Sequence, residues 1–222
     1  MPVTNYLPSS RLIQPGVCTS STRPASPYEG MVIYETDTNK TYVYNGSSWV
    51  MQIAADSPPG LELVKTQTVG TSVSSVTVTN AFSSTYDNYR IVYSGGVGDS
   101  NAYGINMYLG STRTGYYSSY LYIPFSGATS TAQNSNISEF SACGIMTTNG
   151  AYVDVDLIGP NLSRFTYCKN TYIYGAVGGG GGMGSAGQYL NNTTQYTDFT
   201  IFVGASGITG GTIRVYGYRN SI

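Results

Sequence analysis

The 222-residue sequence contains no histidine and only three cysteines. Histidine is the commonest general base and the commonest metal ligand of proteins. Its absence excludes a Ser-His-Asp triad, a Cys-His dyad, an H-E-x-x-H zinc helix and a Cys₂His₂ finger. Cys18, Cys143 and Cys168 are too scattered for a zinc site, and their odd number argues against a disulfide framework. We therefore expect no cofactor, no metal and no enzyme of a familiar kind, but three small thiols in a protein assembled in a reducing cytoplasm.

Charged residues are also scarce. Asp, Glu, Lys and Arg make up 9% of the chain, whereas an average globular domain has about a quarter. The ten basic and eleven acidic residues give a net charge of −1, so no basic surface is available for nucleic acid or an anionic membrane. The N-terminus lacks a signal-peptide pattern, and no apolar run approaches the ~18 residues that cross a bilayer. We expect neither nucleic acid nor membrane as a partner.

Ser, Thr, Asn, Gly and 22 tyrosines take the place of the missing charges, a mixture that favours strands and turns. Apolar residues alternate with polar or small ones from residue 61 onward, and no stretch sustains the spacing of an amphipathic helix. The pattern predicts an all-β protein whose residues 61–222 form a jelly-roll-like antiparallel β-sandwich of eight to ten strands. The alternating sets are Val76/Val78, Tyr89/Ile91/Tyr93, Ile105/Met107/Leu109, Val153/Val155/Leu157, Phe199/Ile201/Val203 and Ile213/Val215.

Residues 1–27 contain five prolines, which exclude a helix or a central strand. The sequence predicts an extended segment here, either a floppy tail or an arm that anchors the chain to another protein. Aliphatic side chains favour the anchoring arm, because pure linkers seldom carry so many of them. The side chains expected to dock on the protein to which the arm binds are Leu7, Leu12, Ile13 and Val17.

Residues 28–55 predict a small three-stranded β-meander, and residues 56–60, with Pro58-Pro59-Gly60, predict a linker. Asn45-Gly46 is the strongest short hairpin signal in the sequence. Three short strands bury too little surface to stand alone, so the meander must pack on the sandwich or on other copies of itself. The linker favours other copies, and the expected oligomer interface consists of Tyr42, Tyr44 and Trp49.

The densest aromatic cluster of the sequence is formed by Tyr116, Tyr117, Tyr120 and Tyr122. Rigid amphipathic rings suit a surface that binds a partner protein or a sugar ring. In the alternative interpretation, alternate rings line the core while the others decorate the outside of a strand. The sequence leaves the two interpretations open.

Two further motifs have structural explanations. Asp154 and Asp156 lie on one face of a predicted strand, and their separation suits the ~5–10 Å between the carboxylates of a glycosidase. Neighbouring apolar residues occupy the core face, however, so we expect both aspartates to be exposed to water and to have no catalytic role. Gly178–Gly184 matches a loose G-x-G-x-x-G but lacks the helix and the Lys-Ser/Thr pair of a phosphate site. We expect an exposed loop here.

The segments Arg23–Gly30, Ile33–Thr38 and Tyr44–Val50 together resemble a module common in fibres, appendages and capsid-associated proteins of tailed phages. Gly211–Arg219 is similar to the last strand of phage appendage sandwiches. The resemblance implies a virion protein that assembles in the bacterial cytoplasm, a homotrimer, and partners among capsid or tail proteins. The short chain favours a capsid decoration, cement or head-fibre protein; the alternative is a tail-fibre adhesin that recognises host surface glycans.

Overall fold

The computed structural model describes residues 15–52, 60–100, 103–175, 180–204 and 206–219. The chain divides into two compact units, one containing the described residues up to 52 and one containing those from residue 60 onward. Every helix or strand assigned within the described residues is a β-strand, which confirms the all-β class.

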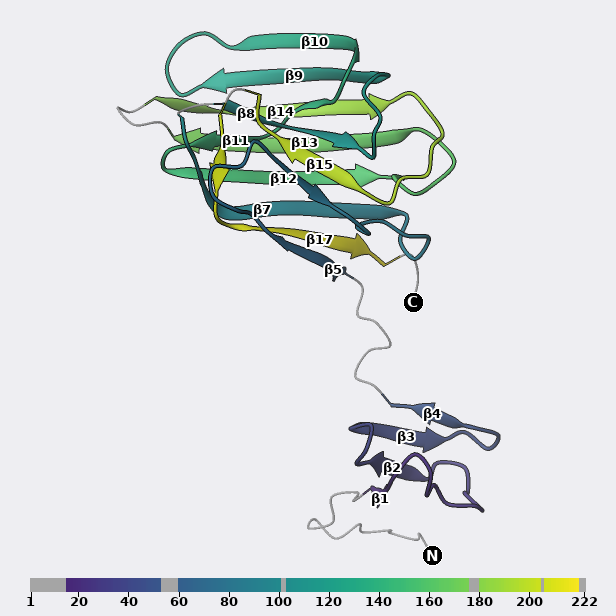
Figure 1. Cartoon of the computed structure of the whole chain (residues 1–222). Helices are drawn as coiled ribbons and strands as arrows, with labels where there is room; N and C mark the ends of the chain where they lie inside the picture. Colours follow the sequence, from purple (N-terminus) through teal and green to yellow (C-terminus); the bar gives the residue numbers. More distant parts are fainter. Residues whose placement is uncertain (1–14, 53–59, 101–102, 176–179, 205, 220–222) are drawn as a thin grey trace, which may run out of the picture. The chain divides into compact units, whose positions relative to one another are not determined.

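The N-terminal unit is a mixed sheet of four strands in the order β1-β2-β3-β4 (Figure 1). Strands β2 to β4 are antiparallel and form the predicted meander. The hairpin between β3 and β4 turns at Asn45-Gly46, where the Asn45 side chain accepts hydrogen bonds from the amides of Ser47 and Ser48 at 3.0 and 2.8 Å. The strands are β1 (Gly16–Cys18), β2 (Val32–Glu35), β3 (Lys40–Tyr44) and β4 (Trp49–Met51).

Strand β1 was not predicted, because it falls inside the stretch expected to be an extended arm. It pairs with β2 in parallel, with Val17 opposite Tyr34. Although the prolines of this region argue against strands, none lies between Pro15 and Pro24, so the intervening amides remain free to pair at a sheet edge. The predicted arm is thus wrong for residues 16–18, which belong to the small sheet, whereas residues 1–14 lie outside the described residues.

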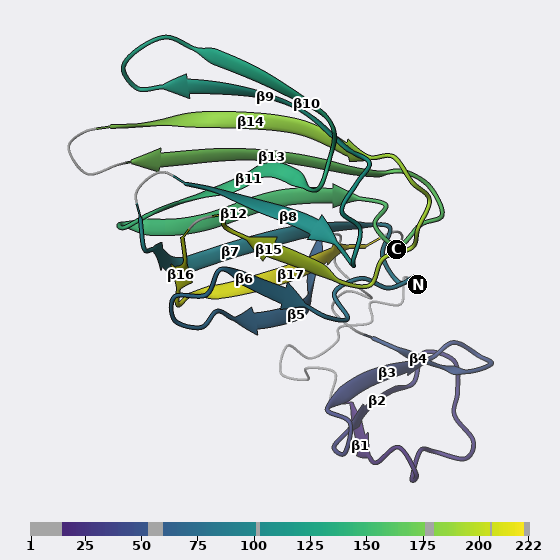
Figure 2. The ribbon, with the colours of Figure 1, turned by 45° about the horizontal axis from the view of Figure 1, so that its top comes forward.

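The second unit is an antiparallel β-sandwich, as predicted, but with more strands than the eight to ten expected (Figure 2). Several strands with small or polar inner residues escaped the apolar alternation pattern. The strands are β5 (Leu61–Thr68), β6 (Ser75–Val78), β7 (Asn88–Gly98), β8 (Tyr103–Leu109), β9 (Tyr116–Pro124), β10 (Ser130–Ile137), β11 (Phe140–Thr147), β12 (Gly150–Ile158), β13 (Thr166–Gly175), β14 (Gly181–Leu190), β15 (Phe199–Phe202), β16 (Ile208–Thr209) and β17 (Thr212–Tyr218).

Hydrogen bonding connects these strands into one curled sheet that branches at β12. The long layer runs β10-β9-β14-β13-β12-β7-β17-β5, and the short layer runs β11-β8-β15-β6. Residues Gly150–Val153 of β12 pair with β11, whereas Val155–Ile158 pair with β13. Strand β11 then crosses the inner side of the long layer, where Asn170 Nδ2 donates to the Ala142 carbonyl at 2.6 Å.

The core lies between the two layers and is built from the alternating residues that the sequence indicated. Tyr89, Ile91 and Tyr93 of β7 are fully buried, and the predicted apolar positions of β8, β12, β15 and β17 are buried with them. One side of each layer therefore faces this core, because side chains alternate along a strand. The opposite side is the outer face of the layer.

Candidate functional site

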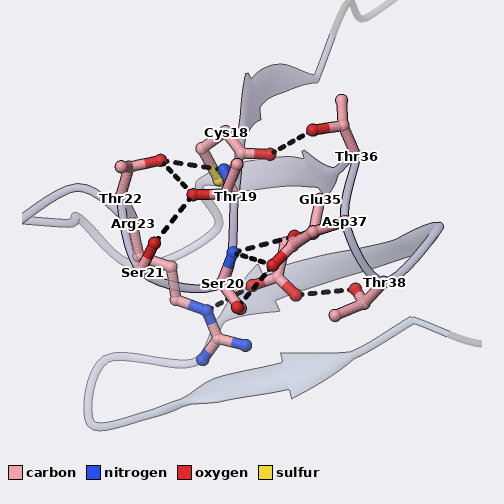
Figure 3. Close-up of polar contacts among 10 residues, drawn as sticks. All are labelled: Cys18, Thr19, Ser20, Ser21, Thr22, Arg23, Glu35, Thr36, Asp37 and Thr38. Atoms are coloured by element: carbon pink, nitrogen blue, oxygen red, sulfur yellow. Dashed lines mark hydrogen bonds and ion pairs between the residues drawn. The ribbon is translucent and has the colours of Figure 1, made fainter.

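A polar cluster holds part of the predicted arm against the small sheet (Figure 3). The Ser20 amide donates to both carboxylate oxygens of Asp37, at 2.9 and 3.1 Å, and the Ser20 hydroxyl donates to one of them at 2.5 Å. These hydrogen bonds lower the pKa of Asp37. The amide and the hydroxyl of Thr36 both donate to the Cys18 carbonyl. This part of the arm is therefore an element of the small unit.

Glu35 is fully buried and is paired with Arg23 (Figure 3). Thr38 Oγ1 donates to the second carboxylate oxygen at 2.8 Å. The hydrogen bond from Arg23 is the largest influence on the Glu35 pKa and lowers it, although burial acts in the opposite direction. The Arg23 guanidinium also lies over the Tyr42 ring, 4.5 Å from its centroid. Tyr42, an expected oligomer contact, is thus partly covered by its own chain.

The remaining predicted contacts of the N-terminal unit differ in exposure. Tyr44 and Trp49 are half-buried and pack against each other, with ring centroids 5.4 Å apart. Val17 is 71% exposed, which leaves it available for docking. Val50, on the same face of the sheet, is also exposed. The other predicted docking residues, Leu7, Leu12 and Ile13, lie outside the described residues.

The predicted tyrosine cluster is divided between the two faces of β9. Tyr116 is fully buried, and its hydroxyl accepts from the Leu109 amide at 2.9 Å. Its assignment to a ligand or partner surface is therefore wrong, because strand alternation turns its ring into the core. Tyr120 and Tyr122 share that inner face and are half-buried, and the Tyr122 hydroxyl lies 2.6 Å from that of Tyr174. Tyr117 alone points to the outer face.

Tyr117 forms one wall of a groove on the outer face of the long layer. Its ring stacks on Tyr189 of β14, with centroids 4.8 Å apart and planes 7° from parallel. Phe165 and Tyr167 extend this aromatic platform on the far side of Tyr189. The groove has a volume of about 500 Å³ and its lining consists of Tyr117, Ser118, Ser119, Gln133, Asn134, Ser135, Gly187 and Tyr189.

The groove combines two features that suit a sugar. Flat tyrosine rings pack against the apolar face of a pyranose, while amides and hydroxyls serve its hydroxyl groups as both donors and acceptors. Gly187 forms an open floor, since no atom lies within 4 Å of where its Cβ would be. Sequence reasoning identified Tyr117 but missed Tyr189 and Gln133. Only strand pairing brings these residues together, and no local motif marks them.

The paired aspartates are held in ion pairs. Arg90 donates two hydrogen bonds to the Asp154 carboxylate, at 2.9 and 2.6 Å. Asp156 accepts from the Tyr218 hydroxyl at 2.7 Å and lies 3.7 Å from the Lys169 ammonium. Both carboxylates are on the outer face as predicted, but each also lies beside a cationic side chain. These ion pairs and hydrogen bonds explain Asp154 and Asp156 as structural residues of the sheet surface.

The glycine-rich run is only partly a loop, because Gly181–Gly184 begin strand β14. The expectation of an exposed loop is wrong for these residues. Gly182 and Gly184 are buried, and a Cβ on Gly184 would lie 2.2 Å from the Tyr172 ring. Glycine is thus required here by the close approach of a core aromatic side chain. Residues 178 and 179 lie outside the described residues.

Among the described cysteines, Cys143 and Cys168 are buried in the core and Cys18 is half-buried. Burial raises the pKa of the Cys168 thiol. The described ranges contain no cluster of three or more His, Cys, Asp or Glu residues that could hold a metal ion. No helix in those ranges is long and apolar enough to cross a membrane.

No family model, no curated protein and no solved structure matches the chain.

Proposed function

We propose that this protein is a structural component of a tailed-phage virion, a capsid decoration, cement or short head-fibre protein. Its N-terminal region attaches the chain to the particle and the sandwich faces outwards. Its partners are other copies of the chain, in a homotrimer, and capsid or tail proteins of the virion. It assembles in the cytoplasm of the bacterial host.

The observation that carries this proposal is the N-terminal unit itself. The residues that resemble the phage module, including Arg23, Glu35 and Asn45-Gly46, are the ones whose contacts hold the small sheet together. The resemblance therefore falls on a compact module with a defined fold. Val17 and Val50 leave one of its faces apolar and exposed, which suits attachment to another protein.

Removal of the N-terminal unit tests the proposal. A fragment comprising residues 60–222 should keep the sandwich, with a cooperative unfolding transition in the near-ultraviolet signal of its own tyrosines, and should no longer join particles. A full-length variant with Val17→Asp and Val50→Asp should also lose occupancy, because burying an unpaired carboxylate at an interface is costly. Normal occupancy of the fragment on purified particles would contradict the proposal.

The groove beside Tyr117 favours a second candidate function, an adhesin that recognises neutral host surface glycans. Its stacked rings and its Gln133 side chain form the kind of surface that sugars contact. Tyr189→Ala should abolish binding to host polysaccharide, while Tyr103→Ala, at an exposed tyrosine outside the groove, should leave it unchanged. Equal binding by both variants would remove this candidate.

A further inference from the structure

A second groove lies on the outer face of the short layer of the sandwich. Two rows of side chains run across the strands here, Thr77-Thr200-Tyr108 and Ser75-Phe202-Asn106. The loop between β8 and β9 places Arg113 above them. The groove has a volume of about 580 Å³, and its lining includes Tyr108, Arg113 and Phe202 together with several serine and threonine side chains.

The Arg113 guanidinium is fixed by aromatic rings. Its Cζ atom lies 4.0 Å from the centroid of Tyr108 and 5.2 Å from that of Phe202. These contacts hold the guanidinium over the rings by cation–π attraction. They do not use its N–H groups, so a ligand can approach the donors in the plane of the group.

Arg113 also lacks a charged partner in the part of the chain that the structure describes. It takes part in none of the four ion pairs found there, and its side chain donates no hydrogen bond to another described residue. The groove lining contains no Asp, Glu or Lys. A planar cation with free donors in an otherwise uncharged groove matches a carboxylate, which binds both donors of the fork at once.

The rest of the lining indicates what carries that carboxylate. Four exposed serine and threonine hydroxyls line the groove with the arginine, from Ser74, Ser75, Thr77 and Ser111, and the hydroxyl of the buried Thr200 lies 2.9 Å from that of Thr77. Hydroxyl groups both donate and accept, as sugar hydroxyls do. Val203 is the one aliphatic side chain of the lining and is buried, and the Arg113 guanidinium lies over the rings of Tyr108 and Phe202, so the groove exposes no aliphatic side chain to a ligand.

We propose that this groove binds an acidic saccharide through its carboxylate, with Arg113 as the anion-binding residue. The exposed hydroxyl side chains of the lining contact the sugar ring that bears the acid. This inference concerns a different surface from the groove of Tyr117, and it depends neither on attachment to a particle nor on binding of neutral glycans.

Calorimetric titration of the full chain at low salt tests the proposal with three probes: an oligosaccharide of hexuronic acid, its carboxyl-reduced neutral counterpart, and inorganic phosphate. The acidic oligosaccharide should bind, and the reduced one should bind at least about tenfold more weakly, as expected for loss of a charge-assisted hydrogen bond. No binding of the acidic sugar, equal binding of its neutral counterpart, or displacement of the sugar by equimolar phosphate would overturn the proposal.

Two arginine variants locate the site. Arg113→Gln should lower the affinity for the acidic oligosaccharide about tenfold or more. Arg113→Lys should retain only part of the wild-type affinity, because lysine keeps the charge without the planar fork. Arg214→Gln removes an arginine from the outer face of the long layer and should leave binding unchanged. Equal effects of Arg113→Gln and Arg214→Gln would overturn the assignment. Amide shifts confined to β6, β8 and β15 on titration would support it independently of the variants.

Discussion

Tyr116 and Tyr117 are adjacent in the chain, yet they have opposite surroundings, because successive side chains of a strand point to opposite faces. Tyr116 is buried and joined by hydrogen bonds to the turn after β8. Tyr117 stacks on a neighbouring ring at the surface. The same type of side chain is therefore a core residue at one position and part of a surface aromatic stack at the next.

We predict that Tyr116→Phe destabilises the sandwich by about 1–3 kcal/mol, because the Leu109 amide would be left buried without an acceptor. Tyr117→Phe is the matched control and should change the free energy of unfolding by less than about 0.5 kcal/mol. Urea denaturation of both variants measures the difference. Equal stability of the two variants would show that the buried hydroxyl contributes nothing.

At the same scale, the Arg23–Glu35 pair predicts acid sensitivity of the small unit. The pKa of Glu35 is lowered in the folded chain, so the unfolded state binds the proton more readily. The stability that this group contributes is complete above its ordinary pKa of 4.5 and is lost as the pH falls through the lower folded value. Asp37, whose pKa is also lowered, adds to the trend in the same direction.

Trp49 is the only tryptophan of the chain, so its fluorescence reports on this unit. In the wild type, the denaturation midpoint of the fluorescence signal should fall as the pH drops below 4.5. In Glu35→Gln it should be lower at neutral pH, where Arg23 has lost its anion, and should fall less on acidification. Parallel pH profiles for the two proteins would refute the role of Glu35.

At the scale of an element, β14 shows how a strand forms from residues with weak strand preference. Its inner face carries Gly182, Gly184 and Ala186, which leave room for bulky side chains from the neighbouring strands. The Tyr172 ring of β13 occupies the space above Gly184. The packing of the adjacent strands therefore requires the small residues of β14.

We predict that Gly184→Ala costs about 1–3 kcal/mol, because the added Cβ would overlap the Tyr172 ring. Gly187→Ala, in the same strand, has no atom within 4 Å of the new methyl group and should be neutral within about 0.5 kcal/mol. Thermal unfolding of the two variants gives the comparison. A neutral Gly184→Ala would mean that Tyr172 has room to move aside.

The same strand shows where sequence reasoning succeeded and where it could not. Strands such as β7 and β12 were predictable, because most of their inner residues are large and apolar and most of their outer residues are polar. In β13 the inner positions hold Thr166, Cys168 and Asn170, so polarity does not distinguish the two faces. The groove of Tyr117 combines residues from three strands, and its geometry depends on a pairing register that composition does not encode.

At the scale of the whole molecule, the chain combines a small sheet with a much larger sandwich. A four-stranded sheet of short strands has little core, and Ile33 and Glu35 are its only described residues that are fully buried. A unit of this size gains stability from association with other chains. The predicted homotrimer would supply that association.

We predict that Trp49→Ala shifts the proposed homotrimer toward monomers while the sandwich stays folded, because truncating an indole that the trimer interface would bury costs ~3–5 kcal/mol. Sedimentation equilibrium at micromolar concentration measures the shift. Tyr28→Ala, at a largely exposed ring of the same unit, is the control and should leave the oligomer intact. A monomeric wild type would count against self-association, and an unchanged oligomer in Trp49→Ala would exclude Trp49 as its anchor.

The position of β17 between β5 and β7 has a consequence for how the chain is made. During translation, residues 61–68 leave the ribosome long before their partners at 212–218. Until β17 has been made, β5 and one edge of β7 lack the strand to which they hydrogen-bond in the folded chain. Open strand edges recruit other chains, and pairings between distant segments form slowly. A chain cut before Thr212 would therefore be prone to aggregation, whereas the complete chain covers these edges.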